Sequence, residues 1–186
     1  MRPQKVNDEE LLSSLTKIFR LRGYEGASLK ELSDGTGLQK ASLYHRFPNG
    51  KQEMAESVLD YMGKWVTDNI FNAFNKQEDS SEARLKHGLL QIRKLYNGGN
   101  VPCLFRALSM QNGMELFHQS IRKGMSEWLM AFKNLGLSMN LSDRLAEEKA
   151  MQTLIDIQGS LILSRGLEDT TIFENTLKNI EIRYTV

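Results

Sequence analysis

The amino-acid sequence predicts an all-α protein with two domains. Apolar residues recur three and four positions apart along most of the chain, which is the spacing of one face of an α-helix. Short segments rich in Gly, Asn, Ser and Asp separate these stretches, as turns do. No stretch alternates between apolar and polar residues as a half-buried strand would, and no internal repeat is present. We expect about nine helices, three of them in an N-terminal domain of residues 1–50 and the others in residues 51–186.

The first predicted helix starts after Asn7. Asn7 and Glu10 have the spacing of a capping box, in which each side chain accepts a hydrogen bond from a backbone N–H at the helix start. One face of the helix then carries Leu11, Leu15, Ile18 and Phe19. Gly23 is expected to end this helix.

Two shorter helices joined by a glycine turn are predicted next. Ser28 and Glu31 form a second capping box, so a helix should begin near Leu29. The segment Gly35-Thr36-Gly37 permits the positive φ angles of a tight turn. A helix from Gln39 to Phe47 follows, and its Leu43 and Phe47 lie four residues apart, as an inward-facing pair does.

The outer face of that third helix carries only neutral and basic side chains. They are Gln39, Lys40, Ser42 and Arg46, with Tyr44 and His45 at the flanks. No acidic residue occurs between Asp34 and Glu53, so a phosphate backbone would meet no repulsion there. Helix-turn-helix proteins place the start of the second helix of this motif in the major groove, where such side chains bond base edges. The pattern predicts DNA binding, although a solvated helical hairpin would have the same local sequence.

The segment FRLRGYEGASLKELSDGTGLQKASLYHRFPNGKQEM resembles the N-terminal DNA-binding domain of TetR-family repressors. It carries the family's G-Y/F-x-G-x-S/T, its A/G-x-G turn and its L-Y-x-x-F signature, and the resemblance covers about residues 8–58. Two positions depart from the common pattern. Residue 35 is Gly where the family usually has Ala, and the link from Pro48 to Lys51 is one residue longer.

The resemblance also implies roles for individual side chains. Base reading would fall to Lys40, Ala41, Ser42 and Arg46. Phosphate contacts would fall to Ser28, Tyr44, His45 and Lys51. Lys30 would take either role, and Gln39 lies on the same DNA-binding face. The expected partner is a double-stranded DNA operator.

The rest of the chain is predicted to be helical. Apolar residues from Met54 to Phe74 recur at helical spacing, so one long helix should connect the N-terminal domain to the remainder, as it does in TetR-like proteins. Further helices are expected over about residues 82–96, 102–108, 115–135, 144–164 and 171–183. The piece GGNVPCLFRAL resembles a segment found in one TetR subgroup.

The last two helices are predicted to form a homodimer interface. The first of them would contribute Ile155, Gly159, Ile162 and Leu163, because a small residue lets two helices approach closely. The second would contribute its apolar side, which consists of Phe173, Leu177 and Ile180. The alternative is that these faces pack within one monomer. A dimer is favoured because a two-fold operator requires two reading heads.

A small effector, apolar or aromatic in character, is expected to bind inside residues 51–186. The candidate contacts are large and adaptable apolar side chains with one amide: Trp65, Phe105, Met110, Met114, Phe117, Trp128 and Gln158. Most aromatic and Met residues at helical spacing belong to a core, so only part of this set is expected to touch a ligand. Which part is not readable from the sequence.

Composition agrees with a cytoplasmic regulator. Residues 1–50 hold eight Lys or Arg against six Asp or Glu, whereas the whole chain has a net charge of +1. No run of 18 apolar residues and no signal peptide is present, so no membrane partner is expected. The single cysteine, Cys103, excludes an intramolecular disulfide, and an inert buried thiol is favoured over an oxidant sensor.

Enzyme activity is not expected. His45, His87 and His118 lie far apart in sequence, and no metal-binding motif or glycine-rich phosphate loop is present, so no cofactor or metal is predicted. The sequence therefore predicts a DNA-binding repressor that a ligand releases from a palindromic operator. The alternative is a helical protein-interaction adaptor that does not bind DNA.

Overall fold

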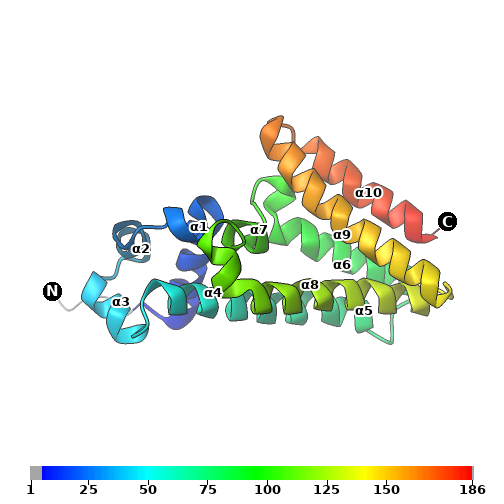
Figure 1. Cartoon of the computed structure of the whole chain (residues 1–186). Helices are drawn as coiled ribbons and strands as arrows, with labels where there is room; N and C mark the ends of the chain where they lie inside the picture. Colours follow the sequence, from blue (N-terminus) through cyan, green and yellow to red (C-terminus); the bar gives the residue numbers. More distant parts are fainter. Residues whose placement is uncertain (1–5, 186) are drawn as a thin grey trace. The chain divides into compact units, whose positions relative to one another are not determined.

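The computed structural model describes residues 6–185, and within this range the protein is built from helices without a β-strand (Figure 1). The helices fall into two compact units, which are described separately. Three of the helical segments, α4, η1 and α5, follow one another without a break from Lys51 to Asn75. With these three counted as one, the described residues contain the nine α-helices that the sequence predicts.

The first unit comprises the described residues up to Gly63 together with Leu104–Ile121. Its elements are α1 (Asp8–Gly26), α2 (Leu29–Thr36), α3 (Lys40–Arg46), the start of α4 (Lys51–Val66), α7 (Leu104–Leu108) and the start of α8 (Asn112–Ser138). Helix α1 packs against both α2 and α7. The core of the unit includes Leu11, Leu15, Phe19, Leu32, Leu43 and Met54, all of which are fully buried.

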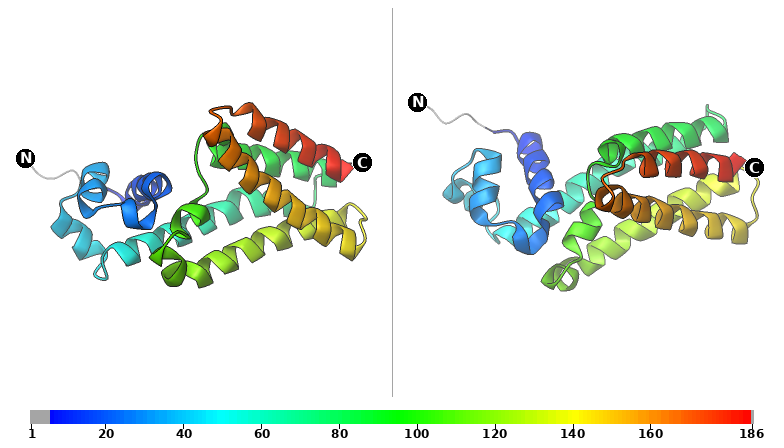
Figure 2. Two further views of the ribbon diagram at one scale, coloured as in Figure 1. Left: turned by 45° about the horizontal axis from the view of Figure 1, so that its top comes forward. Right: turned by 90° about the horizontal axis from the view of Figure 1, so that it is seen from above.

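The second unit comprises Lys64–Cys103 and the chain from Arg122 onward. Its elements are the end of α4, the π-helical η1 (Thr67–Phe71), α5 (Asn72–Asn75), α6 (Ser81–Leu95), the 3-10 helix η2 (Asn97–Gly99), the rest of α8, α9 (Asp143–Gly166) and α10 (Thr171–Thr185). Helices α9 and α10 lie side by side in both views of Figure 2, and α10 also packs against α6.

Both predicted capping boxes are confirmed. At α1 the Asn7 side chain accepts from the N–H of Glu10 at 2.8 Å, and the Glu10 carboxylate accepts from the N–H of Asn7 at 3.4 Å. At α2 Ser28 and Glu31 make the same exchange at 3.2 and 3.1 Å. The backbone N–H and the hydroxyl of Ser28 hold the pKa of Glu31 below its ordinary value. These caps satisfy N–H groups that a helix start leaves without partners.

Two glycines shape the first unit through positive φ angles. Gly37 has φ 69° and caps the C-terminus of α2 in the left-handed conformation, as predicted for the turn. Gly23 has φ 72° and breaks the helical geometry of α1 near its end. A Cβ atom at Gly23 would lie 3.0 Å from the carbonyl oxygen of Ala107. The absent side chain therefore also permits the close approach of α1 and α7.

An aromatic cluster forms part of the core of the second unit. The ring of Phe132 lies 5.1 Å from that of Phe74, 6.0 Å from that of Trp128 and 6.4 Å from that of Tyr184. Phe74 in turn lies against Gly88 of α6, where a Cβ atom would come within 1.9 Å of its ring. The cluster joins α5, α8 and α10, because each of these helices contributes a ring.

The apolar side of α10 faces the interior of its own unit. Phe173, Leu177 and Ile180 are almost completely buried in the monomer, and the Phe173 ring contacts that of Tyr96 at 5.9 Å. A side chain that is already buried cannot present its surface to a second copy. The prediction that these three residues form the dimer interface is therefore wrong, and the alternative of packing within the monomer holds for them.

The compact units are not the same as the predicted domains of residues 1–50 and 51–186. The first unit also takes in the start of α4 and residues 104–121, because α7 packs on α1. The assignment of DNA binding to residues 1–50, and of ligand binding and dimerisation to residues 51–186, stays a prediction. Within residues 6–185 no helix combines the length and the apolar character that crossing a membrane requires.

Candidate nucleic-acid interface

Helices α2 and α3 form a helix-turn-helix with a closed, hydrogen-bonded turn. The Ser33 hydroxyl donates to the carbonyl oxygen of Leu38 at 2.5 Å across the turn. The Thr36 hydroxyl donates to the carbonyl oxygen of Leu32 at 2.7 Å. Leu43 of α3 is fully buried and Phe47, just after α3, is nearly so. These contacts determine which side of α3 faces the core and which side faces outward.

The side of α3 that faces outward is the one predicted to contact DNA. Leu43 is the buried residue of this helix. The exposed members of the predicted set are Ser28, Lys30, Gln39, Lys40, Ala41, Ser42, Tyr44 and His45. An amide, three hydroxyls, an imidazole and two ammonium groups are thus available for base edges and phosphates. The structure makes these side chains accessible, and their individual roles stay predictions.

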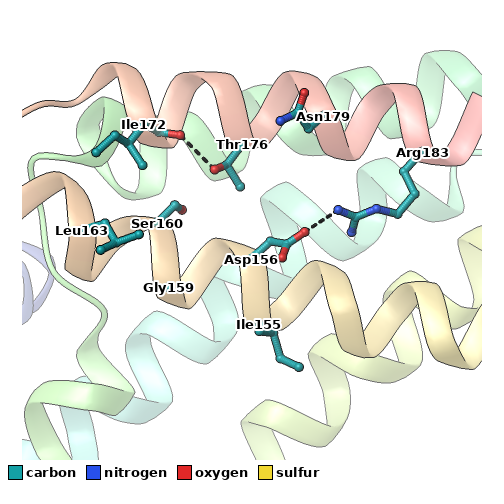
Figure 3. A pocket seen from close by; sticks show the side chains of 9 residues that line it. All are labelled: Ile155, Asp156, Gly159, Ser160, Leu163, Ile172, Thr176, Asn179 and Arg183. Atoms are coloured by element: carbon teal, nitrogen blue, oxygen red, sulfur yellow. Dashed lines mark hydrogen bonds and ion pairs between the residues drawn. The ribbon is translucent and has the colours of Figure 1, made fainter.

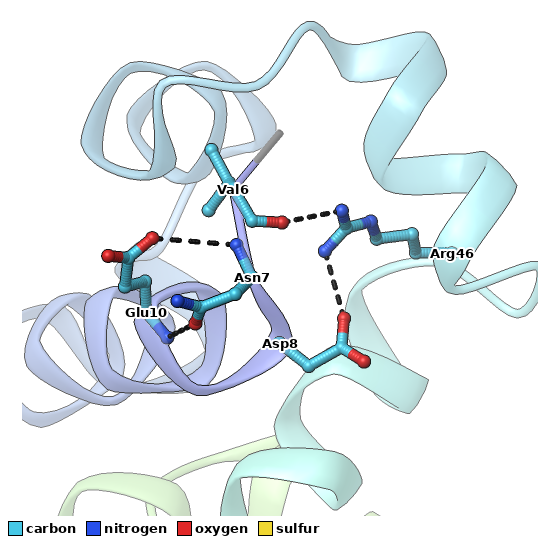
Figure 4. A network of polar contacts seen from close by, with 5 residues as sticks. All are labelled: Val6, Asn7, Asp8, Glu10 and Arg46. Atoms are coloured by element: carbon cyan, nitrogen blue, oxygen red, sulfur yellow. Dashed lines mark hydrogen bonds and ion pairs between the residues drawn. The ribbon is translucent and has the colours of Figure 1, made fainter. Parts of the chain in front are cut away.

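Arg46 differs from these exposed members because its side chain is only 28% exposed and is bonded to residues at the start of α1. One guanidinium nitrogen donates to the carbonyl oxygen of Val6 at 2.7 Å, and another forms an ion pair with Asp8 at 3.0 Å (Figure 4). The sequence did not predict this contact, since about 40 residues separate its partners and no local pattern links them.

Lys51, the predicted phosphate contact at the start of α4, is half-buried. Its ammonium donates to the carbonyl oxygen of Tyr24 at 2.9 Å and lies 4.4 Å from the centre of the Tyr24 ring. That ring packs edge-on against Phe117, with the centroids 5.0 Å apart. Lys51 therefore stabilises the end of α1, and a phosphate would share the ammonium with Tyr24.

We expect Lys51→Ala to weaken binding to every DNA duplex by a similar factor. A phosphate contact carries no base information, so preference among sequences should not change. The slope of log affinity against log salt should become shallower by about 0.9 for each phosphate that the variant no longer neutralises. Fluorescence anisotropy at several salt concentrations measures both quantities. Lys17→Ala is the control, because it removes the same charge from an exposed position of α1. An unchanged salt slope in Lys51→Ala would contradict the assignment.

A surface groove of about 400 Å³ runs between α9 and α10 in the second unit (Figure 3). It is lined by Ile155, Asp156, Gly159, Ser160, Leu163, Ile172, Thr176, Asn179 and Arg183. Ile155 and Leu163 are 54% and 53% exposed, and Ile162 beside them is 51% exposed. The α9 residues of the predicted dimer interface thus lie at the surface, and three of the four line the groove.

Sequence reasoning missed the polar residues of this groove. Arg183 of α10 forms an ion pair with Asp156 of α9 at 2.5 Å. Thr176 and Asn179 complete the polar lining from α10. The two members of the ion pair are 27 residues apart on different helices, so their spacing along the chain carried no signal.

The predicted ligand contacts are divided between the two units. Phe105, Met110, Met114 and Phe117 belong to the first, and Trp65, Trp128 and Gln158 belong to the second. Met110 and Met114 are exposed, whereas Phe117 and Trp128 are buried. Cys103 is buried as well. Contact of these side chains with an effector stays a prediction. The inert role of the Cys103 thiol stays a prediction as well. No group of three or more potential metal ligands occurs among the described residues.

Comparisons with known proteins agree with this geometry. Residues 11–58, which span the helix-turn-helix, match the family model of bacterial regulatory proteins of the tetR family. The HTH-type transcriptional regulator LmrA of Bacillus subtilis is 25% identical over 166 residues, which cover 88% of each chain. A TetR transcriptional regulator from Legionella pneumophila has a similar fold, with a TM-score of 0.81 at 19% identity over 97% of this chain and 98% of the other.

A further structural relative was solved on DNA. A cysteine mutant of the TetR-family regulator CifR, in complex with a 26-base-pair operator duplex, has a TM-score of 0.72 at 20% identity and covers the full length of this chain and 99% of its own. Together with the exposed, acid-free face of α3, these findings make the protein a DNA-binding transcriptional regulator and not an enzyme. Residues 11–58 thus match the DNA-binding domain of the tetR family, and the chain as a whole is similar to transcriptional regulators.

Proposed function

We propose that the protein is a homodimeric repressor that binds a palindromic operator and leaves it when a small, largely apolar molecule binds. The observation that carries the proposal is the exposed face of α3, from Gln39 to His45, on which no acidic residue occurs. Direct base reading needs such donors and acceptors on a helix held firmly by its opposite side. Burial of Leu43 supports that requirement, because it anchors the opposite side of α3.

The groove between α9 and α10 supports the homodimer. Ile155, Ile162 and Leu163 expose more apolar surface than a helix facing water normally does, and Gly159 leaves space for a partner helix. The same surface on a second copy would produce a two-fold axis. A two-fold dimer carries two copies of α3, which matches the two half-sites of a palindromic operator. Phe173, Leu177 and Ile180 support this arrangement from within the monomer, because they hold α10 in place.

The long helix from Lys51 to Asn75 supports control by an effector. It contains α4, which follows the α2–α3 helix-turn-helix in the chain, and the π-helical segment η1. Single π turns are uncommon and often occur where a helix serves a function. Phe71 of η1 packs edge-on against Trp128 of α8 at 5.4 Å. A ligand that prefers the conformation unable to bind DNA would shift the population, and a tenfold preference corresponds to about 1.4 kcal/mol per site.

The direct test is a gel shift with duplexes from the region upstream of the protein's own gene. A regulator should bind one segment selectively, and its affinity should fall steeply as salt rises, because phosphate contacts release counterions. The alternative, a helical adaptor that binds only protein, predicts no selective and salt-dependent shift. Addition of small apolar compounds to the bound complex then tests the repressor's release.

We expect Lys40→Ala and Ser42→Ala to change which operator sequences are preferred. Both side chains lie on the exposed face of α3. Loss of a good base contact typically costs about 1–3 kcal/mol of discrimination at the base pair that it reads. Selection from a randomised duplex library, followed by sequencing, measures the preference. Ser126→Ala is the control because Ser126 is an exposed serine of α8. An unchanged preference in both α3 variants would rule out these two residues as readers.

A further inference from the structure

Arg46 links the end of α3 to the beginning of α1. It is the last residue of α3, and its guanidinium reaches both Val6 and Asp8, the residues on either side of the Asn7 cap (Figure 4). A planar guanidinium suits such a contact because its N–H groups point in fixed directions. The bond to Asp8 is also charge-assisted, which makes it stronger than a bond between neutral groups.

The acceptors of Arg46 are themselves held in place. Asn7 lies between Val6 and Asp8, and its side chain and backbone N–H are both bonded to Glu10. This capping box fixes the path of the chain as it enters α1. Arg46 is therefore bonded to a part of the first unit whose backbone is held by the capping box.

Helix α3 has few other means of holding its position. It has seven residues, the side chain of its N-cap residue Gln39 makes no capping hydrogen bond, and Leu43 is its buried residue. A helix of this length is marginal by itself, so tertiary contacts must set its orientation. Leu43 and Phe47 set which face of α3 is buried, and a contact at Arg46 restrains the end of the helix as well.

We propose that Arg46 is a positioning residue for DNA binding and not a reader of bases. It holds α3 against the N-terminus of α1, so that the exposed side chains of α3 enter the groove in a defined orientation. To contact a base, the guanidinium would have to give up two hydrogen bonds, one of them to a carboxylate. The inference rests on the DNA-binding function proposed above.

Two variants and one control separate this role from direct contact with DNA. Arg46→Met keeps most of the aliphatic stem but removes the charge and both hydrogen bonds. Arg46→Lys keeps the charge, although an ammonium lacks the planar fork that spans Val6 and Asp8. Arg22→Met is the matched control, because it removes an arginine from an exposed ion pair of the same unit, with Glu31 at 3.0 Å.

The first measurement is amide hydrogen exchange in the DNA-free protein. We expect faster exchange in residues 6–12 and 39–47 of Arg46→Met, and no change in those segments of Arg22→Met. Equal exchange in wild type and Arg46→Met would overturn the inference. Because this experiment involves no DNA, its outcome does not depend on the proposed function.

The second measurement is affinity for a duplex that the wild-type protein selects from a randomised library, and for its single-base-pair variants. We expect Arg46→Met to weaken all duplexes by about tenfold, since one or two ordinary hydrogen bonds correspond to roughly that factor. The order of preference and the salt slope should stay unchanged, and Arg46→Lys should recover only part of the loss. A preference altered at particular base pairs, a reduced salt slope, or full recovery by Arg46→Lys would each overturn the inference. If wild type selects no duplex, the proposed function fails instead.

Discussion

Replacement of both Ile155 and Leu163 by glutamate is expected to convert the dimer into monomers and to abolish tight operator binding. Both side chains flank the groove between α9 and α10 and are about half exposed in the monomer. Four carboxylates would be brought together in a two-fold interface, where burial of unpaired charge is costly. A monomer contacts one half-site, so affinity should fall by about 100-fold or more.

Light scattering after size exclusion measures the mass, and a gel shift with the selected duplex measures the affinity. Leu90→Glu serves as the control, because Leu90 is also about half exposed but lies on α6, outside the groove. It should leave both mass and affinity unchanged. A double variant that remains dimeric would place the interface elsewhere, and a wild-type monomer at micromolar concentration would refute the homodimer.

Phe132→Ala is expected to cause the largest loss of stability. The side chain is fully buried, and its ring contacts those of Phe74, Trp128 and Tyr184. Removal of a buried phenylalanine ring leaves a cavity between three helices and typically costs about 3–5 kcal/mol of unfolding free energy. Since whole domains have roughly 5–15 kcal/mol, a large fraction of the stability of the second unit should disappear.

Urea denaturation followed by circular dichroism measures this effect. Met130→Ala is the control, because Met130 lies two residues away on α8 and is 60% exposed. It should change the unfolding free energy by less than about 0.5 kcal/mol, as surface substitutions usually do. A Phe132→Ala protein as stable as wild type would mean that the aromatic cluster does not contribute to the core.

Helices α1, α2 and α3 could be predicted because the sequence features that start and end them are local. The Asn7–Glu10 and Ser28–Glu31 capping boxes each act within four residues, and Gly37 acts through its own φ angle. A core position such as Leu43 followed from helical spacing and is fully buried. Exposure of the DNA-binding face followed in turn, because the residues opposite a buried stripe of a surface helix must face water.

Other parts of the site depended on contacts between distant segments. Apolar spacing on α10 correctly indicated a buried face, but Phe173 packs on Tyr96 of the same chain and not on a second copy. A hydrophobic stripe indicates that its side chains must be buried, but it does not indicate whether the same chain or a second copy buries them. The grouping of residues 104–121 with the N-terminal helices could not be predicted from the sequence for the same reason, since α7 contacts α1 only in the folded protein.

The sequence by itself determined the helices, the turn and the acid-free face of α3, because capping, glycine φ angles and helical periodicity act over a few residues. Only the tertiary structure decided the partners of Arg46, Lys51 and the apolar side of α10. Arg46 is basic and lies at the end of α3, so its position in the sequence was equally compatible with a contact to DNA and with a contact inside the protein. The fold of the first unit brought it instead to Val6 and Asp8, since tertiary structure selects hydrogen-bond partners that lie far apart in sequence.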